Sequence, residues 1–159
     1  MADMLDRGTH DGAVRFGPLA ESLGLLLRLS QLHSFHDFYT ALERHHVRPG
    51  EISILMMIRE NPGIRQGVLA SALMIKRAHM AKMARRLEDA GLIERSVPPD
   101  DRRAMELRLT AQGELRAAEM TPDLEAHEAR NFGGLTPEEA ATLRTLLRKY
   151  LALDAPKED

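Results

Sequence analysis

Between residues 48 and 109 the hydrophobic positions change from helical spacing to the alternation of strands. Apolar residues recur at steps of three and four after Pro49, which is tolerated in a first helical turn. A helix pair and two strand-like pieces follow, and Ile64 could add an edge pairing. The elements are predicted over residues 49–60, 66–73, 76–90, 92–97 and 104–109. Two helices followed by a hairpin are typical of a winged helix-turn-helix, a mainly α fold with a small β-hairpin wing.

The helix predicted over residues 76–90 has an apolar side and a cationic side when it is projected at 100° per residue. The apolar side carries Met80, Met83, Ala84 and Leu87. The opposite side carries Lys82, Arg85 and Arg86. Lys76 and Arg77 lie in the first turn, where positive charge opposes the helix dipole by about 0.3 to 1 kcal/mol each. A phosphate near this end would reverse the penalty, whereas the alternative is a solvated charged face with a poor cap.

The segment between the two strand-like pieces, residues 97–103, is predicted to project as a stiff loop. Its two prolines cannot supply N–H groups to a ladder, so strand pairing should lapse before the tip. An arginine held on such a loop suits the narrow minor groove of DNA, whereas a helix fits the major groove. Asp101 is expected to be an internal partner that steers Arg103 or reaches Arg86.

Four short motifs stand out along the chain. Residues 101–104 read D-R-R-A, residues 109–113 read L-T-A-Q-G, residues 86–95 read R-L-E-D-A-G-L-I-E-R, and residues 134–139 read G-L-T-P-E-E. They resemble the wing signature, the end of the recognition helix and the start of the last helix in the MarR (multiple-antibiotic-resistance regulator) family of transcription factors. The resemblance covers about residues 20–153. The chain departs from the family pattern at Arg65, Lys76 and Pro122.

A long helix is predicted before this lobe, from Leu19 to about His45. Its apolar residues cover more than half of the helix circumference, whereas a helix at the edge of a domain needs only one buried stripe. We therefore expect the helix to pack on its own domain and on a second chain. The alternative is the central helix of a monomeric bundle.

Two further helices are predicted after the wing. Thr110 can cap the first, which runs toward Phe132 and which Pro122 should kink or split. A capping box at residues 136–139 starts the last helix, which has more apolar surface than a terminal helix of one protomer needs. The chain is thus expected to dimerise through its N- and C-terminal helices. The predicted segments are a flexible arm (1–18), an N-terminal dimerisation helix (19–47), the DNA-binding lobe (48–109), C-terminal dimerisation helices (110–153) and a tail (154–159).

Charge is distributed unevenly along the chain. The formal net charge is −2, yet residues 76–103 hold eight Lys or Arg against five Asp or Glu, so this segment carries +3 and the remainder −5. Because there is no cysteine, disulfides and thiol chemistry are excluded. The interrupted N-terminus and the lack of a long apolar run favour a cytoplasmic protein without a membrane span.

The sequence does not predict an enzyme or a bound cofactor. Gly-rich phosphate loops, a Ser elbow and an HExxH motif are absent. His33 and His36 could hold a metal with Asp37, but polar surface and a buried histidine bonded to a neighbour are the alternatives.

The resemblance implies a homodimeric DNA-binding regulator, a ligand-responsive repressor on a pseudo-palindromic operator. The predicted DNA contacts are Gln66, Lys76, Arg77, His79, Lys82, Arg86, Arg102 and Arg103, with Asp101 orienting the wing. The resemblance also implies an effector, such as an aromatic or phenolic acid or its thioester. Its cleft would be lined by Arg28, Phe35, His36, Tyr39 and Met56, which could equally be plain core. A winged-helix module that binds protein, or a His-based metal-dependent protein, is the alternative function.

Overall fold

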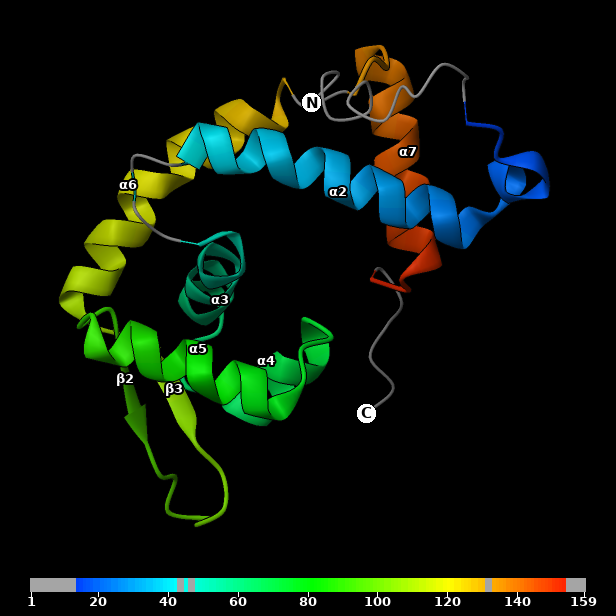
Figure 1. Ribbon diagram of the computed structural model, residues 1–159. Coiled ribbons are helices and arrows are strands. Elements are labelled where there is room, and N and C mark those ends of the chain that lie inside the picture. The colour runs from blue at the N-terminus through cyan, green and yellow to red at the C-terminus, as the bar shows by residue number, and fades with distance from the viewer. Residues whose placement is uncertain (1–13, 43–44, 46–47, 131–132, 154–159) are drawn as a thin grey trace. The chain divides into compact units, whose positions relative to one another are not determined.

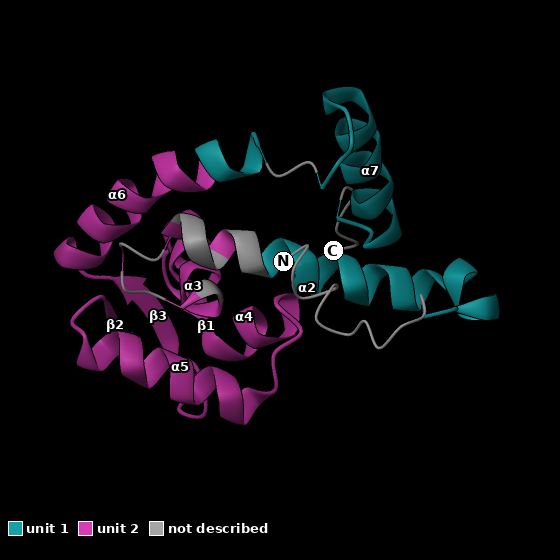
Figure 2. Ribbon diagram, turned by 45° about the horizontal axis from the view of Figure 1, so that its top comes forward, with its two compact units in different colours: residues 1–37, 126–159 teal, residues 38–125 magenta. Residues whose placement is uncertain are grey.

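The computed structural model describes residues 14–42, 45, 48–130 and 133–153, which belong to two compact units. Figure 2 colours one unit, which takes residues up to 37 and from 126, in teal and the other, residues 38–125, in magenta. The described residues form six α-helices, one short 3-10 helix and one three-stranded antiparallel sheet (Figure 1). The predicted fold class, mostly helical with a small β wing, is confirmed.

The second unit contains a helix-turn-helix followed by a hairpin. In chain order its elements are the end of α2 (Leu23–Leu42), α3 (Pro49–Glu60), β1 (Ile64–Arg65), α4 (Gln66–Ala72), α5 (Arg77–Asp89), β2 (Ile93–Ser96), β3 (Glu106–Leu109) and most of α6 (Ala111–Glu128). The strand order is β1-β3-β2, and Leu107 of β3 faces Ile64 on one side and Arg95 on the other. The edge pairing expected at Ile64 is therefore present, and it includes Arg65.

The two wing strands are shorter than the sequence predicts. Both lose residues on the side of the loop, because Pro98 cannot donate to the ladder and the chain turns beyond it. The N–H of Asp101 donates to the carbonyl of Pro98 at 3.4 Å, and the N–H of Ala104 donates to the carbonyl of Asp101 at 3.0 Å. The loop therefore forms hydrogen bonds within itself in place of a strand ladder.

The apolar sides of α3, α4 and α5 bury one continuous core with the sheet. On α5 the four residues predicted to face inward are buried: Met80, Met83, Ala84 and Leu87. On α4 the buried residues are Leu69 and Ala70, while Val68 and Ala72 are exposed. In a helix of only seven residues, the spacing of apolar residues does not show which of two adjacent faces is buried. The packing of α4 against α5 determines the buried face.

The turn between α4 and α5 is a Schellman motif with methionine in the position that glycine usually takes. The N–H of Ile75 donates to the carbonyl of Ala70 at 2.8 Å, and the N–H of Met74 donates to that of Ser71 at 3.1 Å. Met74 has φ of +52°, in the left-handed region, and its side chain is 83% exposed. This tight turn lets α5 begin only five residues after α4 ends.

Helix α6 begins at the cap that the sequence predicts. The hydroxyl of Thr110 accepts from the N–H of Gly113 at 3.0 Å and donates to the carbonyl of Gly91 at 2.6 Å. The helix is not split at Pro122, since Ala111–Glu128 forms one continuous element. Immediately before the proline, the hydroxyl of Thr121 donates to the carbonyl of Ala117 at 2.8 Å.

The other unit contains a 3-10 helix η1 (Gly17–Glu21), the N-terminal part of α2, the last residues of α6, and α7 (Pro137–Tyr150). The long helix predicted from Leu19 to about His45 is therefore shorter, because the chain leaves helical geometry at Ser22 and α2 ends at Leu42. The capping box of α7 is confirmed, with both bonds between Thr136 and Glu139 formed, at 3.2 and 2.8 Å. Over the described ranges, no helix is both long and apolar enough to pass through a bilayer.

Candidate nucleic-acid interface

The outward face of α5 is cationic from its N-terminus to Arg86. Its exposed basic side chains, with Lys76 just before the helix, are Lys76, Arg77, Lys82, Arg85 and Arg86, and His79 is exposed beside them. Four buried apolar residues on the opposite side hold the helix to the core. The loop at the end of the hairpin projects beyond α5 in Figure 1. Helix and loop thus offer two basic elements within one unit.

The N-terminus of α5 has no side-chain cap. Lys76 occupies the cap position, with φ of −59° and ψ of 136°, and its side chain makes no capping hydrogen bond. The Lys76 carbonyl accepts from the N–H groups of His79 and Met80, at 2.9 and 3.0 Å, so the helix is closed by its backbone alone. In the part of the chain that the structure describes, the first N–H groups of α5 therefore lack a side-chain acceptor, and they lie beside Lys76 and Arg77, an arrangement suited to an anion.

The last turns of α5 carry charged side chains that pair within the protein. Glu88, whose charge opposes the helix dipole, accepts from Nε and Nη2 of Arg95 on β2, at 2.8 and 2.5 Å. Arg86 does not reach Asp101; its Nη1 lies 3.2 Å from Oε1 of the buried Glu51 at the start of α3. Both contacts bind the end of α5 to its own unit.

The tip of the wing is held by two aspartates. Oδ1 of Asp101 accepts from the N–H of Arg103 at 2.9 Å, and its Oδ2 lies 3.9 Å from Nη1 of Arg65. Asp100 accepts from Nη2 of the same arginine at 2.5 Å. Arg102 and Arg103 are exposed, and over the described ranges neither side chain has an ion pair. The wing therefore exposes two guanidinium groups, and contacts between the loop and Arg65 connect it to the start of α4.

Gln66, the remaining predicted DNA contact, opens α4. Its N–H donates to the carbonyl of Met105 at 2.7 Å, while its side-chain Oε1 is buried without a hydrogen-bond partner in the described part of the chain. Sequence reasoning did not identify Glu51, Arg65 or Asp100 as parts of this site. An acid in the first turn of a helix is common, so nothing in the sequence linked Glu51 to a residue 35 positions later.

The residues expected to line an effector cleft are distributed over both units. Arg28 and Phe35 lie exposed on α2 in the first unit, while Met56 is half-buried on α3 in the second. The side chains of His36 and Tyr39 lie outside the described part of the structure, so these five residues stay a prediction.

The histidines do not assemble a metal site in the described residues. No group of three or more His, Asp or Glu side chains there is close enough to hold an ion. His45 matches the alternative expectation, since it is buried and its Nε2 lies 2.6 Å from Oδ2 of Asp123. Arg116 also donates to the carbonyl of His45 at 3.0 Å. The side chains of His36 and Asp37 are outside the described set.

The helix pair, the hairpin and the cationic face define a winged helix-turn-helix protein. The model of the MarR family matches residues 47–105. A proposed transcriptional regulatory protein for the hcr operon of Thauera aromatica is 32% identical over 140 residues, covering 87% of this chain and 84% of that protein. The chain belongs to the MarR family, as its motifs predict, and thus to a family of transcription regulators rather than enzymes.

Other relatives and solved structures agree with this assignment. Transcriptional regulator HosA of Escherichia coli O111:H- is 30% identical over 125 residues, covering 76% of this chain and 92% of HosA. The transcriptional repressor CouR, solved with a 23-mer DNA duplex, is 30% identical with a TM-score of 0.74, covering 91% of this chain and 100% of CouR. BpsR of Bordetella bronchiseptica, whose DNA binding is regulated by 6-hydroxynicotinic acid, is 26% identical with a TM-score of 0.76, covering 93% and 100%.

Proposed function

We propose that this chain is a DNA-binding transcription regulator that places α5 in a major groove and the wing in a flanking minor groove. The observation that carries the proposal is the uncapped, lysine- and arginine-flanked N-terminus of α5 beside a wing with exposed Arg102 and Arg103. A phosphate at this helix end would receive backbone N–H groups and cationic side chains together. Its relative CouR has been solved on a DNA duplex, which supports the same use here.

Within this proposal, Lys82 and Arg77 reach base edges, His79 assists, and Lys76 and Gln66 bind phosphates. Lys82 and Arg77 are exposed on the outward face of α5, and neither has a partner among the described residues. The N-terminal half of a recognition helix is the part that contacts bases in helix-turn-helix proteins, which favours residues 77–82. The wing arginines would then read the width of the minor groove beside them.

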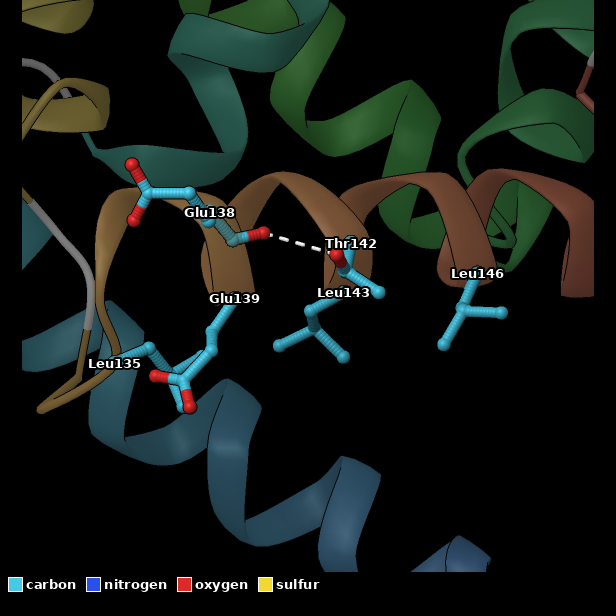
Figure 3. A pocket seen from close by; sticks show the side chains of 6 residues that line it. All are labelled: Leu135, Glu138, Glu139, Thr142, Leu143 and Leu146. Atoms are coloured by element: carbon cyan, nitrogen blue, oxygen red, sulfur yellow. Dashed lines mark hydrogen bonds between the residues drawn. The ribbon is translucent and has the colours of Figure 1, made fainter.

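The regulator would act as a homodimer on a pseudo-palindromic operator. Apolar side chains stay exposed on α2 and α7, the two longest helices of the first unit: Leu23, Leu26, Leu29, Leu32, Phe35, Leu143, Leu146 and Tyr150. Figure 3 shows a groove on α7 in which Leu135, Leu143 and Leu146 form the apolar part. An apolar surface of this extent is rarely left in water by a monomer. A second copy of the chain would cover it and set two α5 helices about one turn of DNA apart.

Regulation by a small aromatic acid is the final part of the proposal. Support comes from BpsR, a protein of similar fold whose DNA binding responds to 6-hydroxynicotinic acid. A ligand that favours a dimer with wrongly spaced recognition helices would lower operator affinity by the ratio of its affinities for the two states. Arg28 or a histidine of α2 would bind the carboxylate. Such a repressor would work in the cytoplasm, where it meets the DNA.

The deciding experiment is to select duplexes bound by the purified chain from the source genome at low and moderate salt. A DNA-binding regulator is expected to enrich a small set of sequences with two related half-sites, and titrating aromatic acids should release some of them. A winged-helix module that binds only protein would enrich none. Release by no acid would contradict the effector class and leave the DNA function intact.

A further inference from the structure

Glu51 at the start of α3 is a buried carboxylate with two different attachments. Its Oε2 accepts from the backbone N–H of Arg48 at 3.2 Å, which fixes the side chain to the first turn of its own helix. Its Oε1 lies 3.2 Å from Nη1 of Arg86, but without the alignment of a hydrogen bond. Only 7% of the Glu51 side chain is exposed, against 42% for Arg86. Arg86 is therefore the positively charged partner of a carboxylate that is largely removed from water.

Arg86 lies in the C-terminal part of α5, nine residues after the helix begins. At a rise of about 1.5 Å per residue, it is roughly 13 to 14 Å along the axis from the uncapped end. The same surface of α3 also touches α5 one turn earlier, since a Cβ added to Gly50 would lie 2.8 Å from Cε of Met83. Two adjacent contacts, one apolar and one ionic, thus join the start of α3 to the middle and end of α5.

Helix α3 is itself held in place at its other end. Nη1 of Arg59 donates to the hydroxyl of Thr121 on α6 at 3.1 Å, and Ile52, Ile54, Leu55 and Ile58 of α3 are fully buried. A charge contact to α3 therefore fixes α5 against an element that cannot easily move. Because the Glu51 carboxylate is largely removed from water, its attraction for the neighbouring guanidinium is screened less than the attraction within a fully exposed pair.

We propose that Glu51 and Arg86 are a positioning pair that sets the orientation of the recognition helix, and that Arg86 acts through Glu51 and not by contacting DNA. This revises the expectation from sequence that Arg86 is a DNA contact, and it rests on the proposed DNA-binding role of α5. Arg85, next to it and exposed on the same helix, has no ion pair within the described residues, so Arg85→Gln shows what the loss of an unpaired cation from this face alone does to the affinity and to the salt slope.

The test compares Glu51→Gln, Arg86→Gln, the double variant and Arg85→Gln in the full chain. The probe is a duplex that the unaltered chain selects from the source genome, and affinity is measured across a salt series well below each variant's unfolding temperature. A positioning pair predicts that both single variants lose about tenfold in affinity, equivalent to about 1.4 kcal/mol. The double variant should lose no more than either single one, and the slope of log affinity against log salt should stay unchanged in all three.

A direct phosphate contact predicts the opposite pattern. Arg86→Gln would then reduce the salt slope by about one, and Glu51→Gln would leave affinity unchanged or raise it by releasing the arginine. Either result, or losses that simply add in the double variant, would overturn the positioning role. If the unaltered chain selects no duplex, both the proposed function and the positioning role fail. If it binds and the variants follow the phosphate pattern, only the positioning role fails.

Discussion

Nη2 of Arg65 lies 2.5 Å from Oδ2 of Asp100, and this contact joins the start of α4 to the tip of the wing. Both side chains are exposed, at 43% and 67%, so the pair adds at most about 1 kcal/mol to the stability of the fold. Its main consequence is local, because the other contact that Arg65 makes with the loop, to Asp101, is longer at 3.9 Å. The contact restrains the segment that carries Arg102 and Arg103.

Replacing Asp100 by Asn should therefore loosen the wing without unfolding the protein. Under native conditions, trypsin is expected to cleave after Arg102 or Arg103 several times faster in the variant, since cleavage needs a locally opened loop. The thermal midpoint should shift by only a few degrees. Glu119→Gln, which removes an exposed ion pair with Arg116 on α6, is the control and should leave the cleavage rate unchanged. Equal rates in all three proteins would contradict the restraint.

The wing arginines are expected to contribute to DNA affinity and not to folding. Arg103→Ala should weaken binding to a selected duplex at moderate salt, because it removes an exposed guanidinium that has no ion pair within the described residues. Its unfolding curve should match that of the unaltered chain. Lys82→Ala separates two roles: a phosphate contact lowers the salt slope by about one, whereas a base contact relaxes the preference at one position. Unchanged affinity of Arg103→Ala would remove the wing from the mechanism.

We expect any side chain at Gly113 to destabilise the fold, because the α-carbon of Gly113 lies close to the backbone that follows α5. A Cβ at this position would lie 1.9 Å from the backbone carbonyl oxygen of Leu92, and backbone cannot move aside as a side chain can. Gly113→Ala should lower the free energy of unfolding by about 1 to 3 kcal/mol, measured by denaturant titration. Gly67→Ala is the control, because a Cβ there meets nothing within 4 Å and alanine favours the helix by about 0.5 to 1 kcal/mol.

The exposed apolar side of α7 should govern assembly. Leu146→Glu places a charge on the side that carries Leu143 and Tyr150, so a dimer that buries this side should dissociate into monomers. Light scattering after size exclusion gives the mass directly. Thr145→Glu adds the same charge on the opposite, solvated side of the helix and should leave the mass unchanged. A single monomeric mass for the unaltered chain would exclude the homodimer.

Helix, wing and caps follow from local sequence. The period of apolar residues located α5 and its four buried side chains, and the capping signals at Thr110 and Thr136 located the starts of α6 and α7. These features depend on hydrogen bonds and side-chain spacing within a few residues, so the sequence contains all the information required. The family resemblance was likewise readable from the wing motif and its flanks.

The pairing of charges was decided by tertiary structure alone. Arg86 was expected to face DNA or Asp101 and instead pairs with Glu51. Arg65, where the chain departs from the family pattern, pairs with Asp100 on the wing. Each partner is 35 residues away along the chain. A charged side chain pairs with whichever opposite charge the fold brings near, and that depends on how helices and strands pack over the whole unit. Sequence determined which surfaces are basic, whereas packing determined which of those cations remain available to a ligand.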